Sequence, residues 1–330
     1  MLRIIDYPWH QVHLYRMVTA LPASFTVAGV RLPYWNTAQR PVPGNVKFVG
    51  MDDIESDDYD LAILHLDQWC DLMNLRAFPF RFMNQKVQVP KVIIMHGTPD
   101  SEENRRAILR LMGNLPVVCN SRQAALEWDG GEGRLDLYGL PQFRPIIHGY
   151  VDEFFNYPLA HRGLGAITIC SGGDMSRWYH GLPLVERLRR DVPLTWVGPR
   201  GDRPWCSNYT EYRVMLASGL IYFSPTRRAP MPGSRTEAML SGCCIVSVPG
   251  NDFQDYVEQG VNGFIVDTYE DARDCLHWLL ENPEIAYEVG QRGREAALRF
   301  FDHKRYSRDW LMMLGGIDVP SVLRERDGVN

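Results

Sequence analysis

The sequence lacks an apolar run that could cross a bilayer, for which roughly 18 residues are needed. It also lacks the apolar core of a secretory signal peptide, because Asp6, His10, His13 and Arg16 interrupt its first stretch. Internal repeats and low-complexity segments are missing as well. These absences argue against a transmembrane helix and predict a cytoplasmic, globular protein.

Cysteine patterns are scarce too. The seven cysteines are odd in number and form no Cys-x-x-Cys pair, so neither a disulfide framework nor a zinc motif is indicated. Cys243 and Cys244 are adjacent in a predicted strand, where buried thiols are expected. His10 and His13 would share one helix face, but zinc needs a further ligand that the sequence does not identify. We therefore expect no metal and no cofactor.

Two further classes of function are disfavoured. A net charge of -5 argues against a general nucleic-acid surface. No Gly-x-Gly-x-x-Gly follows a predicted strand, which argues against NAD-dependent redox chemistry. The predicted helix 103–112 carries Arg105, Arg106 and Arg110 beside apolar residues, a pattern that fits either an acidic membrane surface or packing on a sheet. We favour packing over peripheral membrane contact.

The chain does have alternating β-prone and helical segments. Its 330 residues, 45% of them hydrophobic, are natural for two domains. Strands are predicted at 2–5, 24–28, 61–64, 92–95 and 116–119, and again at 166–170, 194–197, 221–223, 243–248 and 264–266. Helices are predicted at 11–20, 101–112 and 122–128, with two more over 283–314 that break near Phe301 and Asp302. This alternation indicates two parallel α/β sheets.

One segment, residues 221–250, combines a strand, a charged loop, a helix and a second strand. The strand stops at Ser224-Pro225, and the following loop carries Arg227, Arg228 and Arg235. A helix is predicted at 237–240, beginning with Glu237 and ending near Gly242. In a parallel sheet such a loop lies at the carboxyl edge, where ligands bind. A carboxylate beside arginines suits a sugar hydroxyl and a phosphate.

This segment resembles the donor-binding signature of the GT-B glycosyltransferases, in particular the retaining glycosyltransferase family 4, also called glycosyl transferases group 1. The resemblance is carried by Pro225-Thr226, Glu237-Ala238-Met239, Gly242 and Ile245-Val246. Further phrases agree in order along the chain, namely 117–121, 147–155, 255–257 and 260–266. The first 90 residues match the family pattern poorly.

The resemblance implies an α/β fold of the GT-B type, with two Rossmann-like domains facing each other across a cleft. Residues 1–154 would bind the acceptor, 155–165 would be a linker, and 166–301 would bind the nucleotide sugar. Residues 302–330 would form a C-terminal helix and tail that cross back to the first domain. The segment 155–165, with Pro158, Gly163 and Gly165, lacks strand or helix periodicity.

The resemblance also implies roles for donor-site residues. Glu237 would hold the ribose hydroxyls, while Ala229 stands where the family has a first glutamate that positions the sugar. His180 takes the place of a lysine that neutralises the diphosphate, and an arginine is missing near Asp174. Replacement contacts to the donor would come from the following residues: Arg177, Arg227, Arg228, Arg235, Thr236 and Gly173. Each arginine has an equally good alternative interpretation, as a solvated surface residue or as a member of a weak ion pair.

Three histidines are candidates in the first domain. His96 follows the strand 92–95 and precedes Thr98-Pro99, an N-cap and first-turn pair. In similar enzymes a histidine here reaches the donor sugar, so His96 is our catalytic candidate, although loop backbone contacts would also satisfy it. His10 and His13 are acceptor-side candidates. The acidic Asp58-Tyr59-Asp60 precedes a strand and is interpreted as a solvated turn rather than a metal site.

The leading hypothesis is therefore a glycosyltransferase that moves a sugar from a nucleotide-diphosphate sugar to an unidentified acceptor. The resemblance implies retention of configuration, by same-face attack assisted by the leaving phosphate, and no metal. Loss of usual contacts at Ala229, Asp174 and His180 supports an alternative, a degenerate GT-B protein that binds a nucleotide or glycan as a regulatory or structural subunit. A sugar-nucleotide epimerase is a third possibility. The base, the sugar, the acceptor and the oligomeric state stay open.

Overall fold

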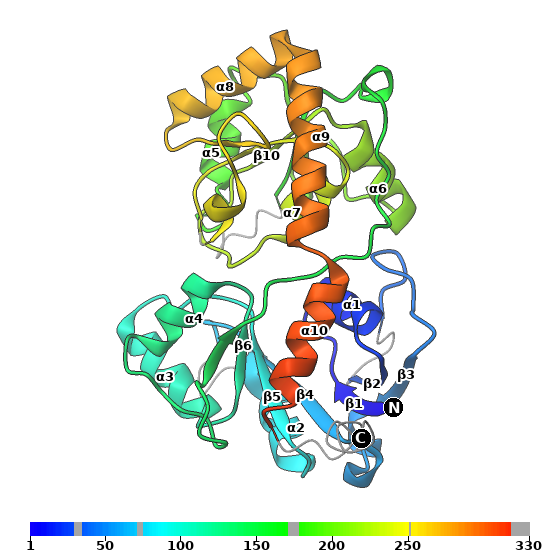
Figure 1. Ribbon diagram of the computed structural model, residues 1–330, viewed down its shortest axis with the longest axis vertical. Coiled ribbons are helices and arrows are strands. Elements are labelled where there is room, and N and C mark those ends of the chain that lie inside the picture. The colour runs from blue at the N-terminus through cyan, green and yellow to red at the C-terminus, as the bar shows by residue number, and fades with distance from the viewer. Residues whose placement is uncertain (30–34, 71–74, 171–177, 251, 318–330) are drawn as a thin grey trace, which may run out of the picture. The chain divides into compact units, whose positions relative to one another are not determined.

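The computed structural model describes residues 1–29, 35–70, 75–170, 178–250 and 252–317 (Figure 1). They form two compact units. The first contains Met1–Val151 together with the chain from His303 onward, and the second contains Asp152–Asp302. None of the described helices is both long and apolar enough to cross a membrane.

The first unit is built on a parallel sheet with the strand order β3-β2-β1-β4-β5-β6-β7. The strands are β1 Leu2–Asp6, β2 Ala23–Gly29, β3 Val46–Gly50, β4 Leu61–Leu66, β5 Lys91–Met95, β6 Val117–Cys119 and β7 Phe143–Pro145. The helices are α1 Gln11–Ala20, α2 Phe78–Lys86, α3 Glu102–Met112, α4 Arg122–Asp129 and α10 His303–Leu314. The order reverses between β1 and β4, which pair in parallel.

Side chains that alternate along these strands divide the first unit into two hydrophobic layers. On one face Ile4 and Ile63 pack with Leu14 of α1 and Trp310 of α10. The other face is covered by apolar residues of α2, α3 and α4, among them Trp128. The C-terminal helix α10 thus packs on the first sheet, as the sequence predicted, and α9 ends at Phe300, next to the predicted break.

The second unit has its own parallel sheet, with the order β12-β11-β10-β8-β9. Its strands are β8 Ala166–Ile169, β9 Leu194–Val197, β10 Ile221–Ser224, β11 Cys244–Ser247 and β12 Phe264–Ile265. Its helices are α5 Leu182–Leu188, α6 Tyr209–Ser218, α7 Gly233–Leu240, α8 Tyr269–Glu281 and α9 Pro283–Phe300. Side chains of α5, α8 and α9 share one hydrophobic core with the sheet. The adjacent cysteines Cys243 and Cys244 are buried, as expected.

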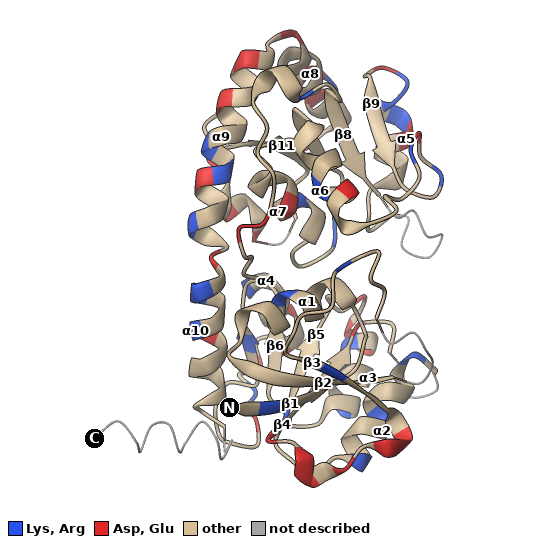
Figure 2. Cartoon of the chain, turned by 90° about the vertical axis from the view of Figure 1, so that its right-hand side faces the viewer, with Lys and Arg blue, Asp and Glu red and all other residues tan. Residues whose placement is uncertain are grey.

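The segment predicted as a linker, 155–165, belongs to the second unit, which begins at Asp152. Arg162 anchors this segment, since its buried guanidinium donates to the carbonyl oxygens of Gly219 at 2.7 Å and Ser241 at 2.8 Å. A segment fastened in this way is part of a domain, although its Pro and Gly content has the composition of a linker. Helix α9 in the same unit contains both acidic and basic residues (Figure 2).

Candidate functional site

The second sheet reverses its strand order between β8 and β10, which pair in parallel. Ligands of open parallel sheets bind beyond the carboxyl ends of the strands at such a reversal. The loops that follow β8 and β10 leave from this point and contact each other. The backbone N–H of Arg227 donates to the carbonyl oxygen of Tyr179 at 2.8 Å. The loop within the segment 221–250 therefore lies at the carboxyl edge of the sheet, beside the reversal of strand order.

A glycine permits the close approach of these two loops. Gly181 has φ of 69°, and a Cβ atom added there would lie 1.9 Å from the carbonyl oxygen of Pro225. Next to it, His180 is partly buried, and burial lowers the pKa of its imidazole below 6.5. A neutral His180 cannot supply the positive charge of the lysine that it replaces. Two other predicted donor contacts, Gly173 and Arg177, lie outside the described residues.

Helix α7 begins at Gly233, four residues before the predicted start at Glu237. The earlier start follows from Pro232, whose restricted φ suits the residue that precedes a helix. Thr236 and Glu237 consequently lie inside the helix and are buried. The carboxylate of Glu237 accepts a hydrogen bond from the hydroxyl of Tyr212 on α6 at 2.5 Å. Glu237 is thus held in a fixed place near the reversal of the sheet.

The predicted arginines occupy two different environments. Arg227 is exposed and Arg228 is partly buried in the loop after β10. Arg235, by contrast, has only 1% of its surface exposed, and its guanidinium carbon lies 3.5 Å from the ring centre of Phe253. Because α7 begins early, Arg235 turns into the interior instead of standing in the loop as its sequence position suggested. Arg227 and Arg228 are therefore more accessible from solution than Arg235.

In the first unit the structure brings the three predicted histidines together. His10 precedes α1, His13 lies in its first turn, and His96 follows β5. The ring centres of His13 and His96 are 5.0 Å apart, those of His10 and His13 are 4.3 Å apart, and His10 stacks on His96 at 6.2 Å. His148, which the sequence reasoning missed, joins them with its ring centre 4.3 Å from that of His13.

Two other polar residues that the sequence reasoning missed are buried beneath this cluster. His65 Nδ1 lies 2.8 Å from His96 Nε2, and His65 Nε2 lies 2.7 Å from the carboxylate of Asp6. Asp6 ends β1 and His65 lies within β4, at the point where the first sheet reverses its order. A polar residue inside the otherwise apolar strand 61–66 was the signal that could have identified His65.

Burial and mutual repulsion keep several of these groups neutral. Burial is the main cause that lowers the pKa of His13, His96 and His148 well below the usual value of 6.5, and neighbouring histidines lower it further. Burial also raises the pKa of Asp6, an effect that the adjacent His65 opposes. The cluster is therefore poor in positive charge at neutral pH and offers imidazole nitrogens as hydrogen-bond acceptors.

The described residues contain no group of three or more His, Cys, Asp or Glu side chains arranged to hold a metal ion. Near Asp58-Tyr59-Asp60, Asp60 is buried instead of solvated. Its carboxylate accepts from the backbone N–H of Arg3 at 2.9 Å and from the guanidinium of Arg3 at 2.9 Å. It precedes β4, at the amino end of the sheet, away from the histidines.

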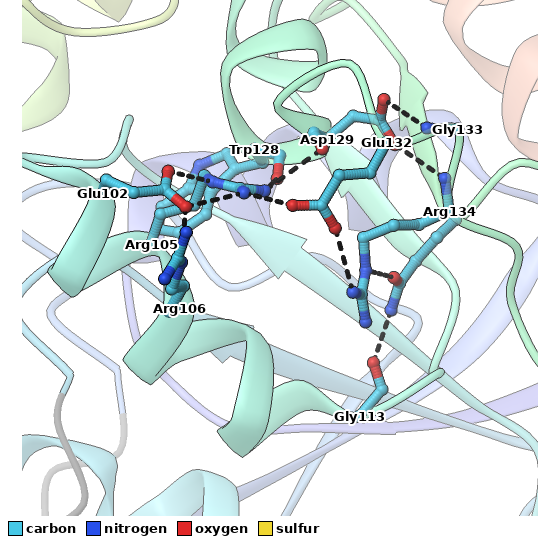
Figure 3. Close-up of polar contacts among 10 residues, drawn as sticks. Glu102, Arg105, Arg106, Gly113, Trp128, Asp129, Glu132, Gly133 and Arg134 are labelled. Atoms are coloured by element: carbon cyan, nitrogen blue, oxygen red, sulfur yellow. Dashed lines mark hydrogen bonds and ion pairs between the residues drawn. The ribbon is translucent and has the colours of Figure 1, made fainter.

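The basic helix α3 packs on the first sheet through Ile108, Leu109 and Met112. Arg105 is buried rather than on an outer basic face, and it pairs with Glu102 and Glu132 (Figure 3). Its guanidinium also donates to the backbone carbonyls of Trp128 and Asp129. Arg105 is therefore committed to holding α3 against the end of α4.

Comparisons with known proteins agree with this architecture. Residues 204–296 match the family model described as glycosyl transferases group 1. No curated protein matches the chain in sequence. Among solved structures, Anabaena HepE in complex with UDP-glucose superposes with a TM-score of 0.70 at 12% identity, over 96% of this chain and 100% of that one.

Two other solved structures are similar over nearly the full length. Sucrose-phosphate synthase from Thermosynechococcus elongatus gives a TM-score of 0.66 at 12% identity and covers 100% of both chains. A glycosyltransferase from Rickettsia africae gives 0.65 at 11% identity and covers 98% of both. The chain therefore has the GT-B fold, and part of its second unit matches the glycosyl transferases group 1 model.

Proposed function

We propose that this protein is a glycosyltransferase that transfers a sugar, a hexose in the simplest case, from a nucleotide-diphosphate sugar to an acceptor. The observation that carries the proposal is the position of Glu237. Its buried carboxylate lies on α7, beside the reversal of the second sheet and within the segment that matches glycosyl transferases group 1. A carboxylate there suits the two hydroxyls of a ribose, which donate hydrogen bonds that it accepts.

The second unit would bind the nucleotide and the first would bind the acceptor. Arg227 and Arg228, in the loop after β10, would meet the diphosphate, whose negative charge grows as the sugar leaves. In the first unit, His96 would face the reacting sugar, with His10 and His13 on the acceptor side. The structural neighbour HepE was solved with UDP and with UDP-glucose, which makes UDP-glucose the first donor to test.

Glu237→Gln tests the ribose contact. Glutamine keeps the shape of the side chain but loses the charge, and a hydrogen bond to a charged group contributes about 1.5 to 3 kcal/mol. Calorimetry with UDP should therefore show an affinity that is lower by roughly tenfold or more. Glu153→Gln is the matched control, because Glu153 likewise accepts a tyrosine hydroxyl, from Tyr209 at 2.6 Å. Equal affinities in both variants would contradict the placement of the ribose.

Retention of configuration and independence of metal are part of the proposal and rest on the family resemblance. The anomeric configuration of the product, read by NMR, tests the first. Activity that persists after EDTA treatment tests the second. Inversion, or a loss of activity restored by a divalent cation, would contradict them.

A second candidate is a protein that binds the nucleotide without transferring the sugar. Ala229, which has no carboxylate where the family places a sugar contact, and the neutral His180 favour it. Nucleotide release from sugars of UDP, GDP, ADP and TDP separates the two candidates, since only a transferase turns the donor over.

A further inference from the structure

The second unit contains a cavity of about 540 Å³ that is separate from the proposed donor contacts. It lies between α6, the loop that follows β9 and the segment that precedes β8, all of which belong to this unit. Small-molecule sites have volumes of about 300 to 1,000 Å³. The lining residues that carry the argument are Arg203, Trp205, Glu211, Val214 and Met215.

The cavity follows from the short outer side of the second sheet. In the first sheet β1 pairs with β2, and β3 covers the outer side of β2. In the second sheet β8 pairs with β9 in the same way, but no further strand covers β9 within the described part of the chain. Only a single bridge between Val197 and Arg203 continues the sheet there. Space that β3 fills in the first unit is therefore left open in the second.

The walls of the cavity are fixed by the backbone. The loop after β9 folds back on its strand, because the carboxylate of Asp202 accepts the backbone N–H of Trp196 at 2.9 Å. A Cβ atom added at Gly201 would lie 2.3 Å from the carbonyl oxygen of Trp196, so this approach requires glycine. On the other side, the backbone N–H of Leu164 donates to the carbonyl oxygen of Ser218 at 3.1 Å. The cavity is thus preformed.

Helix α6 presents different faces to the cavity and to the proposed ribose contact. Glu211, Val214 and Met215 line the cavity, and their spacing of three and four residues places them on one face. Tyr212, about a quarter of a turn away, donates to the carboxylate of Glu237 instead. A ligand in the cavity would therefore leave the contact between Tyr212 and Glu237 in place.

The cavity offers an unusual amount of accessible apolar surface. Trp205 is 48% exposed, and its indole ring has no aromatic or cation–π partner among the described residues. Val214 is 37% exposed beside it, while Met215 is buried. Large apolar side chains that are exposed together in a hollow mark a binding surface. The flat face of Trp205 suits a ring that stacks on it.

Two charged groups stand beside this aromatic face. Glu211 Oε2 accepts the backbone N–H of Ser207 at 2.7 Å, and the bonds from Ser207 lower the pKa of its carboxyl, so it is ionised at neutral pH. Its Oε1 accepts no hydrogen bond within the described part of the chain. The guanidinium of Arg203 is likewise without a hydrogen bond or ion pair to the described residues. The cavity therefore provides both an acceptor and a donor.

We propose that this cavity binds a neutral saccharide, with a sugar ring stacked on Trp205 and its hydroxyl groups shared between Arg203 and Glu211. A sugar ring has apolar C–H groups on its faces, and each hydroxyl at its edge both donates and accepts. A phosphorylated ligand would bring negative charge next to Glu211, which repels it. The site goes beyond the proposed function and needs no sugar transfer.

Saturation-transfer NMR with neutral disaccharides of glucose, galactose and mannose tests the site in the full-length protein. At least one disaccharide should bind. Trp205→Ala removes the stacking face and should weaken that binding by about tenfold or more. Glu211→Gln keeps the shape of the side chain but loses its charge, and should weaken the binding by roughly tenfold.

Trp278→Ala is the matched control, because Trp278 is similarly exposed, at 44%, and lies on α8 outside the cavity lining. It should leave disaccharide binding unchanged. Glu237→Gln should also leave it unchanged while it weakens UDP binding, and Trp205→Ala should do the reverse. This opposite pattern in the two variants would show two separate sites and two folded variants.

Several results would overturn the saccharide site. They are no binding of any disaccharide, equal binding by Trp205→Ala and the unmodified protein, or a loss in Trp278→Ala as large as that in Trp205→Ala. Displacement of the disaccharide by uridine or glucose 6-phosphate would contradict its neutral sugar class. A fall in UDP affinity in Trp205→Ala would make the cavity part of the donor site. Failure of the unmodified protein to bind UDP would overturn the proposed function and leave the saccharide site standing.

Discussion

At Thr236 a side-chain hydroxyl is fully buried, and its oxygen has no hydrogen-bond partner among the described residues. An unpaired buried hydroxyl costs stability, so Thr236→Val should raise the free energy of unfolding by about 1 kcal/mol in urea denaturation. If the hydroxyl contacts the donor, the same variant should weaken UDP binding. Thr168→Val on β8 removes another unpaired buried hydroxyl and should stabilise without changing the affinity. Equal UDP affinities in the two variants would exclude Thr236 from the donor site.

Single residues differ in how far the sequence could locate them. The positions of Glu237 and His96 at the carboxyl edges of their sheets could be predicted, because each lies in the loop or helix that follows a predicted strand. Asp6 and His65 could not, since their contact depends on β1 and β4 being neighbours. That adjacency is a property of strand order, and local patterns of apolar residues do not encode it. The inward turn of Arg235 was missed because the start of α7 was misplaced by one turn.

At the scale of elements, strongly apolar strands were predicted well and marginal ones were not. The predicted strand 2–5 agrees with β1 to within one residue, because this strand is mostly apolar and buried. In contrast, β3 and β7 were missed, since both are edge strands of the first sheet and contain exposed residues. Both gain their structure from pairing with a neighbouring strand. The segment 155–165 was predicted as a linker for a similar reason. Its structure depends on contacts of Arg162 with residues distant in sequence, and local sequence patterns do not show such contacts.

Helix α9 packs very closely against the backbone that follows α7. A Cβ atom added at Gly290 would lie 2.3 Å from the carbonyl oxygen of Gly242, so α9 packs against backbone there. Alanine normally stabilises a helix interior by about 1 kcal/mol over glycine. Gly290→Ala should do the opposite and lower the free energy of unfolding by about 1 to 3 kcal/mol in urea denaturation, because backbone must shift. Gly44→Ala, with nothing within 4 Å, is the control and should be nearly neutral. A Gly290→Ala variant that is more stable than the unmodified protein would show that α9 does not pack this closely against the backbone at Gly242.

Considered as a whole molecule, the chain repeats one arrangement with different chemistry. Each unit has a parallel sheet that reverses its strand order once along its length, and each places polar side chains at the carboxyl ends of the strands there. In the second unit these are a carboxylate and loop arginines, which suit a nucleotide diphosphate. In the first they are neutral histidines with one buried carboxylate, which suit hydroxyl groups. The proposed division of labour, with the donor in the second unit and the acceptor in the first, rests on this difference.

The buried histidines should make the stability of the folded chain depend on pH. His13, His96 and His148 have a folded pKa well below the value of about 6.5 expected when unfolded, so the unfolded chain binds more protons as the pH falls through 6.5. Their contribution is complete above about pH 7.5 and is lost below 6.5, by at most about 1.4 kcal/mol per pH unit for each histidine. Asp6, whose folded pKa is raised by burial, contributes with the opposite sign.

Urea denaturation at several pH values between 8 and 5.5 measures this loss. The midpoint should stay level near pH 8 and fall steadily below pH 7. His148→Asn removes one buried imidazole and should reduce the slope, by at most about 1.4 kcal/mol per pH unit, since the unfolded chain then takes up one proton fewer. The exposed His161 provides the control, because His161→Asn should leave the slope unchanged. A midpoint that does not move between pH 8 and 5.5 would mean that the histidine cluster takes up protons while folded.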